Sequence, residues 1–108
     1  MRVLIDACLP ILLKQHLRAN EVRTARELGW QFKKNGDLLA AAHTRFDVVI
    51  TMDKNIPAQN YLARFTLGLV IVRTRSNRLA DLMPWVPEMI LAIARIRPGD
   101  VIVIPREG

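Results

Sequence analysis

Three short, largely apolar runs restrict this chain to a sheet that is buried on both faces. The runs occupy residues 48–51, 69–72 and 101–104; Thr51 is their one polar residue, and none alternates apolar with polar side chains. An antiparallel sheet with one face in water shows that alternation, whereas a parallel sheet covered on both faces lacks it. Two shorter strands are predicted at residues 2–5 and 21–24. The pattern predicts a parallel sheet of about five strands.

Apolar residues at helical spacing separate these strands, so helices are expected to form the connections. Helical stretches are predicted near residues 9–17, 25–28, 38–46, 57–65 and 84–96. The last one is expected to bury Val86, Met89, Ile90, Ile93 and Ala94. The chain has 108 residues, 51% of them hydrophobic and 24% charged, and shows no linker or internal repeat. We therefore expect a single α/β sandwich domain over residues 1–108.

Basic residues exceed acidic ones, since 16 Lys and Arg face 10 Asp and Glu and give a formal net charge of +6. This excess favours a polyanionic partner, nucleic acid first and an acidic membrane surface second, although it also serves solubility alone. No apolar run approaches the roughly 20 residues that cross a bilayer. The apolar start of the chain is interrupted by Asp6 and has no small-residue cleavage site, so a cytoplasmic protein is expected.

The single cysteine, Cys8, excludes an internal disulfide and any zinc site that needs several cysteines. It lies in an apolar run, where a cysteine is usually a small buried hydrophobe. The two histidines, His16 and His43, are far apart in the chain and have no second cysteine to join them as ligands. A zinc enzyme is therefore not expected.

The position of each acidic residue relative to the strands indicates which acids belong to a site. In an open parallel sheet, sites form beyond the carboxyl ends of the strands. Asp6 and Asp53 directly follow strands, whereas Asp47 and Asp100 directly precede them. Asp37 opens a helical stretch, where an aspartate either caps the helix or joins a site. The candidate site acids are therefore Asp6, Asp37 and Asp53.

Two carboxylates at neighbouring strand ends repel each other and need a cation nearby. Mg²⁺ or Mn²⁺ would meet that need, and direct salt bridges to Lys or Arg are the alternative. The cations expected at the same edge are Lys54, Arg73, Arg75 and Arg78, with Lys33 and Lys34 in the loop before Asp37. An acidic metal centre rimmed by cations suits a nuclease that acts on a polyanion.

Several short motifs occur in an order that is similar to a known family. They are Val3-Leu4-Ile5-Asp6 with Leu9-Pro10, Arg26-Glu27-Leu28-Gly29, Gly36-Asp37 and Thr51-Met52-Asp53-Lys54-Asn55. Together they resemble the small stand-alone PIN-like proteins, a branch of the PIN-domain nuclease superfamily with many toxins of bacterial toxin–antitoxin pairs. The resemblance covers nearly the whole chain. It implies a three-layer α/β/α sandwich with an acidic cluster at the carboxyl edge of a parallel sheet.

The resemblance also implies that Asp6, Asp37 and Asp53 bind Mg²⁺ or Mn²⁺ for the cleavage of RNA. The family often has a fourth acid where this chain has Asn55. That residue would bind the metal through its amide oxygen or a water, or would cap the helix that opens at Pro57. The candidates for RNA binding are Lys54, Arg73, Arg75, Asn77 and Arg78.

The first functional hypothesis is a metal-dependent endoribonuclease, the toxin of a toxin–antitoxin pair. The second is a PIN-like module that binds RNA or a protein but has lost catalysis, which is consistent with Asn55. A signalling receiver also has aspartates after its first and third strands. Receivers usually carry a paired acid on the first strand and a lysine after the last, where this chain has Ala7 and Pro105.

Three aromatic residues lie in or beside loops, and each has two possible roles. Trp30, Phe32 and Trp85 either cap the ends of the core or form an interface for an antitoxin or a second copy of the chain.

Overall fold

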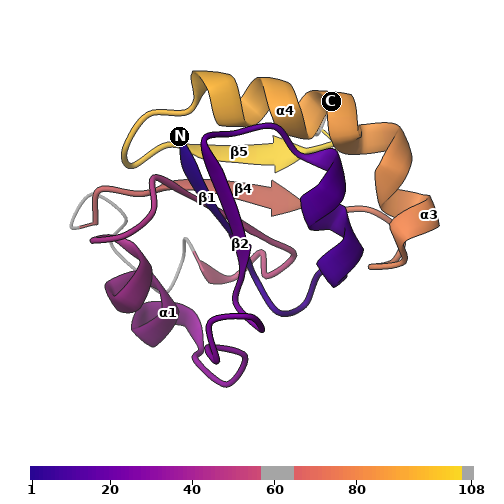
Figure 1. The fold of residues 1–108 in the computed structure, drawn as a ribbon. Coiled ribbons are helices and arrows are strands. Elements are labelled where there is room, and N and C mark those ends of the chain that lie inside the picture. The colour runs from indigo at the N-terminus through magenta and orange to yellow at the C-terminus, as the bar shows by residue number, and fades with distance from the viewer. Residues whose placement is uncertain (57–64, 106–108) are drawn as a thin grey trace.

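Five parallel strands form one sheet in the computed structural model, which describes residues 1–56 and 65–105 (Figure 1). The strands are β1 (Arg2–Ile5), β2 (Glu21–Thr24), β3 (Val48–Thr51), β4 (Gly68–Val72) and β5 (Val101–Ile104). All five predicted strands are confirmed, and β4 begins one residue earlier than expected. The predicted fold class, an α/β sandwich around a parallel sheet, is confirmed as well.

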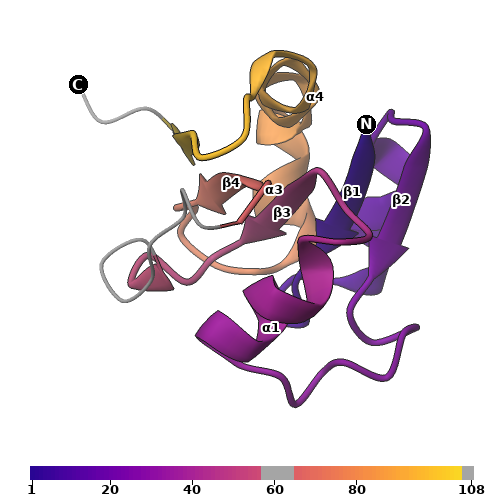
Figure 2. The same cartoon turned by 90° about the vertical axis from the view of Figure 1, so that its left-hand side faces the viewer.

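Helical segments cover both faces of the sheet. Successive strand residues point to opposite sides, so apolar strands present apolar side chains on both faces, and each face needs a cover. The segments are η1 (Ile11–His16), α1 (Asn35–Ala42), α3 (Leu79–Leu82), η3 (Met83–Trp85) and α4 (Val86–Arg95). Val3 and Ile5 belong to the core shared with η1, α3 and α4, whereas Leu4 belongs to the core shared with α1. Figures 1 and 2 show α4 on one face and α1 on the other.

Proline divides the helical stretch predicted near residues 84–96. Helical structure begins earlier, at Leu79, and α3, η3 and α4 follow one another directly. Pro84 and Pro87 each lie at the start of a segment, because proline lacks the backbone N–H that a helix interior requires. The predicted inner face is partly wrong, since Ala94 is exposed and Ile90 is only half-buried. The buried residues of α4 are Val86, Met89, Ala92 and Ile93.

Two other helical predictions also change. In the stretch predicted near residues 9–17, only Ile11–His16 is helical, as a short 3₁₀ helix rather than an α-helix, and Leu9, Leu13 and Leu17 are buried. Residues 25–28 form turns that end at Gly29, whose φ of 74° is in the region that favours glycine. The helix predicted from Pro57 lies outside the described residues.

The strand order β2-β1-β3-β4-β5 determines where a site can form. From β1 the chain moves to one side to form β2 and then crosses to the other side to form β3. The connections that leave the carboxyl ends of β1 and β3 therefore diverge and open a crevice, which is where doubly wound sheets bind ligands. Asp6 follows β1 and Asp53 lies just past β3.

Candidate functional site

Asp6 is held in a fixed position at the end of β1. Its backbone N–H donates to the carbonyl of Ile50 over 2.9 Å, so pairing with β3 continues one residue past the strand. One carboxylate oxygen, Oδ1, accepts a hydrogen bond from the Ala7 N–H over 2.7 Å. The other, Oδ2, accepts one from the Thr51 hydroxyl over 2.7 Å. The half-buried carboxylate is thus oriented before any ligand arrives.

Thr51 joins the two strand ends and was not a predicted site residue. Its side chain is fully buried, and its hydroxyl donates to Asp6 Oδ2 while it accepts from the Asp53 N–H over 3.0 Å. Because β1 and β3 are neighbours, one hydroxyl reaches both acidic positions. The sequence signal was a hydroxyl at the end of an otherwise apolar run, directly before the motif that contains Asp53.

Asp53 is half-buried and shapes the turn that leaves β3. Its Oδ1 accepts a hydrogen bond from the Asn55 N–H over 3.0 Å, the geometry of an Asx turn. Asn55 itself is exposed. Its proposed capping of a helix at Pro57 concerns residues outside the described part of the chain.

Asp6 and Asp53 line one hollow of about 480 Å³. The other residues around it are Ala7, Cys8, Gln31, Lys33, Lys34, Leu38 and Met52. Within residues 1–56 and 65–105, no Lys or Arg forms an ion pair with either aspartate. The described cations therefore do not neutralise these carboxylates by direct salt bridges.

Asp37 does not join the other two acids in this hollow. It is exposed in the first turn of α1, where a negative charge interacts favourably with the helix dipole. In the part of the chain that the structure describes, no three His, Cys, Asp or Glu side chains come close enough to hold a metal ion. The structure thus brings together two of the three predicted carboxylates.

Cys8 differs from the buried hydrophobe that its context predicted. The residue is exposed, and its sulfur lies 3.7 Å from both Asp6 Oδ2 and the Thr51 hydroxyl. Its side chain thus contacts the polar groups of the site instead of the apolar core. The Met52 N–H donates to the same sulfur over 3.4 Å. Partial burial of the thiol and the nearby Asp6 charge raise the pKa of Cys8, which keeps the thiol neutral at pH 7.

The loop after β4 approaches the end of β1 through Asn77. The Asn77 amide donates to the Cys8 carbonyl over 3.1 Å. Arg73, Arg75 and Arg78 are exposed in or beside this loop and lie at the carboxyl edge, as expected, but none of them lines the acidic hollow. Arg75 and Arg78 line a separate hollow. Lys54 is also exposed and lies outside the acidic hollow, next to Asp53 in the chain.

The acids predicted at the opposite edge have structural partners. Asp47 accepts hydrogen bonds from the backbone and guanidinium of Arg2, at 2.7 and 3.3 Å from Oδ2. Burial alone would raise the pKa of Asp47, but these bonds and the Arg2 charge together lower it. Asp100 accepts a bond from the Arg97 N–H over 3.0 Å. Both residues help to form turns or strand ends rather than a site.

The three aromatic residues have different surroundings. Trp30 packs edge-on against Phe46, at 6.2 Å between ring centroids, and Arg45 covers its ring. Trp85 packs half-buried against the core beside α4. Phe32 is 86% exposed. Trp30 and Trp85 therefore cap the core, whereas Phe32 does not.

Comparison with known proteins adds no relative to this geometry. No protein-family model, no curated protein and no solved structure matches the chain. Among the described residues, no helix is long and apolar enough to cross a membrane.

Proposed function

We propose that this chain is a Mg²⁺- or Mn²⁺-dependent endoribonuclease that acts at the hollow between the carboxyl ends of β1 and β3. One observation carries the proposal: two half-buried carboxylates, Asp6 and Asp53, line a single hollow at the point where the sheet connections diverge. Neither forms an ion pair with a described cation. Such a pair of carboxylates favours a cation that binds in the hollow.

The donor set fits a hydrated divalent ion. Mg²⁺ is usually held by one or two carboxylates and keeps several waters or substrate phosphates as its other ligands. Asp6 and Asp53 would supply the two carboxylates, with Asp37 and Asn55 lying outside the hollow. When bound, the ion supplies positive charge to the phosphodiester and lowers the pKa of a coordinated water. The Thr51 hydroxyl and the Ala7 N–H orient the Asp6 carboxylate for this task.

Lysines bring the substrate to the carboxylates. Lys33 and Lys34 line the same hollow, so a phosphate backbone that enters it meets two positive charges beside the acids. Lys54, Arg73, Arg75, Arg78 and Asn77 would extend the grip along the carboxyl edge. The resemblance to PIN-like proteins further supports a toxin role in the cytoplasm, with an antitoxin as partner.

The test is cleavage of a labelled panel of single-stranded RNAs in Mg²⁺, Mn²⁺ or EDTA. We expect metal-dependent products that fall by at least about 100-fold in Asp6→Asn, since several kcal/mol of transition-state stabilisation are lost. Asp100→Asn at the opposite edge is the matched control and keeps its activity. Full activity of a folded Asp6→Asn protein would refute the proposal.

A second candidate is a module that binds RNA without cutting it. Its supporting observation is that Asp37 lies outside the hollow while Asp53 Oδ1 already accepts a bond from the Asn55 N–H. It predicts RNA binding that weakens with salt and gives no product in either metal.

A further inference from the structure

The two edges of the sheet are built differently. The edge strand β2 carries Glu21 and Arg23, which form an ion pair at 3.2 Å. Charges of this kind protect an edge from pairing with another chain. The opposite edge strand, β5, has the sequence Val-Ile-Val-Ile and no charge. No described strand pairs with its outer side. The β5 edge therefore lacks the protection that β2 has.

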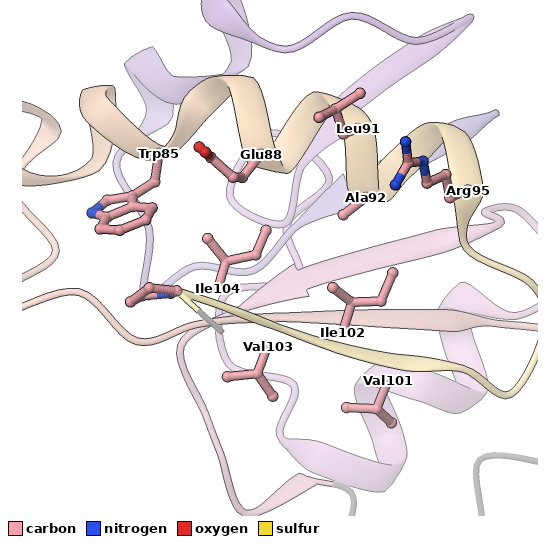
Figure 3. Close-up of a pocket in the computed structure, with 10 residues that line it drawn as sticks. Trp85, Glu88, Leu91, Ala92, Arg95, Val101, Ile102, Val103 and Ile104 are labelled. Carbon is pink, nitrogen blue, oxygen red and sulfur yellow. The ribbon is translucent and has the colours of Figure 1, made fainter. Parts of the chain in front are cut away.

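A groove of about 630 Å³ runs between β5 and α4 at this edge. Figure 3 shows Ile102 and Ile104 directed toward the helix, and Val101 and Val103 toward the other face. Leu91 of α4 is 52% exposed and Val101 is 39% exposed. An apolar groove beside an unpaired strand offers both buried area and backbone hydrogen bonds to a partner.

The backbone of β5 presents two residues outward. The carbonyls of Asp100 and Ile104 accept bonds from the β4 side, from the N–H groups of Leu69 and Arg73. Because N–H and C=O groups alternate in direction along a strand, Val101 and Val103 direct theirs away from the sheet. In a symmetric antiparallel pair, Val101 would then exchange hydrogen bonds with Val103 of a second copy, and Ile102 would face its own equivalent.

The charges on α4 match the same symmetry. Glu88, Leu91 and Arg95 are spaced by three and four residues and so share one face of the helix. Figure 3 shows Glu88 over the end of β5 and Arg95 over its start. Within the described part of the chain, neither charge forms an ion pair. A twofold axis at Leu91 and Ile102 places Glu88 of each copy opposite Arg95 of the other.

We propose that a second copy of this chain docks at the groove, with β5 pairing antiparallel to β5 and α4 packing against α4. The two sheets then form one continuous sheet, and the unpaired apolar edge is removed from both copies. The paired strands run in opposite directions, so their carboxyl ends point to opposite sides of the joined sheet. The acidic hollows of the two copies therefore lie on opposite sides as well. This interface does not depend on the proposed nuclease activity.

The test is sedimentation equilibrium of the full chain between about 1 and about 100 µM. We expect a species of twice the 12.3 kDa chain mass. Glu88→Arg and Arg95→Glu each place like charges opposite one another and weaken association about tenfold or more. An equimolar mixture of the two variants associates again, because every contact in the mixed dimer joins opposite charges. Arg18→Glu, an equal charge change at an exposed residue of another segment, is the control.

A monomer at the highest concentration overturns the proposal, and leaves the groove to a different partner. So does a mixture that associates no better than its components. The proposal is also overturned if the Leu91→Lys variant still dimerises while its circular dichroism shows an unchanged fold. The interface would then lie elsewhere on the molecule.

Discussion

At the scale of single residues, one buried hydroxyl links the two acidic positions of the site. Thr51 binds Asp6 Oδ2 and the Asp53 N–H, so it sets the relation between two residues that are far apart in the chain. The Cys8 sulfur lies against the same hydroxyl. The site is therefore a small hydrogen-bonded unit, and loss of one member leaves others without partners.

Thr51→Val tests this unit, since valine keeps the shape and removes the hydroxyl. We expect the free energy of unfolding to fall by about 1–3 kcal/mol, because an Asp6 carboxylate oxygen and the partly buried Asp53 N–H lose their partner. Urea denaturation measures the change. Thr51→Ser, which keeps the hydroxyl, is the control and should lose less. Equal losses in both variants would show that the methyl group, and not the hydroxyl, stabilises the site.

At the scale of elements, close approach of the chain segments requires a small residue at the start of β4. A Cβ on Gly68 would lie 2.6 Å from Ile96 Cγ1 and 2.7 Å from Ile96 Cδ1. Ile96 follows α4 directly and is buried in the core. The glycine thus lets the end of α4 pack closely on the sheet.

Gly68→Ala is expected to destabilise the protein by about 1–3 kcal/mol through overpacking. Ile96→Ala alone creates a cavity and costs about 2–5 kcal/mol. The double variant should lose clearly less than the sum, because the alanine methyl then occupies part of the space that Ile96 leaves. Thermal or urea unfolding of the four proteins gives the coupling energy. Strict additivity would contradict the packing argument.

At the scale of the whole molecule, charged residues are arranged differently at the amino ends of the strands, called the amino edge, and at their carboxyl ends, called the carboxyl edge. The amino edge neutralises Asp47 with Arg2, whereas the carboxyl edge combines two carboxylates with Lys33 and Lys34 around one hollow. With a net charge of +6, the whole chain attracts polyanions, and the acidic hollow at the carboxyl edge offers them two lysines beside the two carboxylates.

The salt dependence of RNA binding locates that attraction. In EDTA, where cleavage is absent, the double variant Lys33→Ala/Lys34→Ala should reduce the slope of log K against log salt by about 0.7 per lysine. Fluorescence anisotropy with a labelled single-stranded RNA measures the slope. Lys14→Ala is the control, because Lys14 already pairs with Glu27 at 2.9 Å. An equal reduction in the control would indicate diffuse attraction without a defined path.

The sequence by itself determined the strands and the position of the acids along them. Apolar runs are local patterns that only a doubly covered strand can bury, so β3, β4 and β5 were predictable. The same locality placed Asp6 and Asp53 at the carboxyl edge, because each lies within two residues of a strand end. Helix boundaries were less predictable, since Pro84 and Pro87 divide the last helical stretch.

Only the tertiary structure decided which residues meet. The order β2-β1-β3-β4-β5 makes β1 and β3 neighbours, which brings the Thr51 hydroxyl to Asp6 across 45 positions of sequence. Asp37 lies on the exposed first turn of α1 and does not line the hollow, although the resemblance implied that it joins the other two acids. The strand order also makes β5 an edge, although its sequence resembles that of an interior strand. The local sequence pattern shows that a segment is buried. Strand order and crossover direction determine which other segments it packs against.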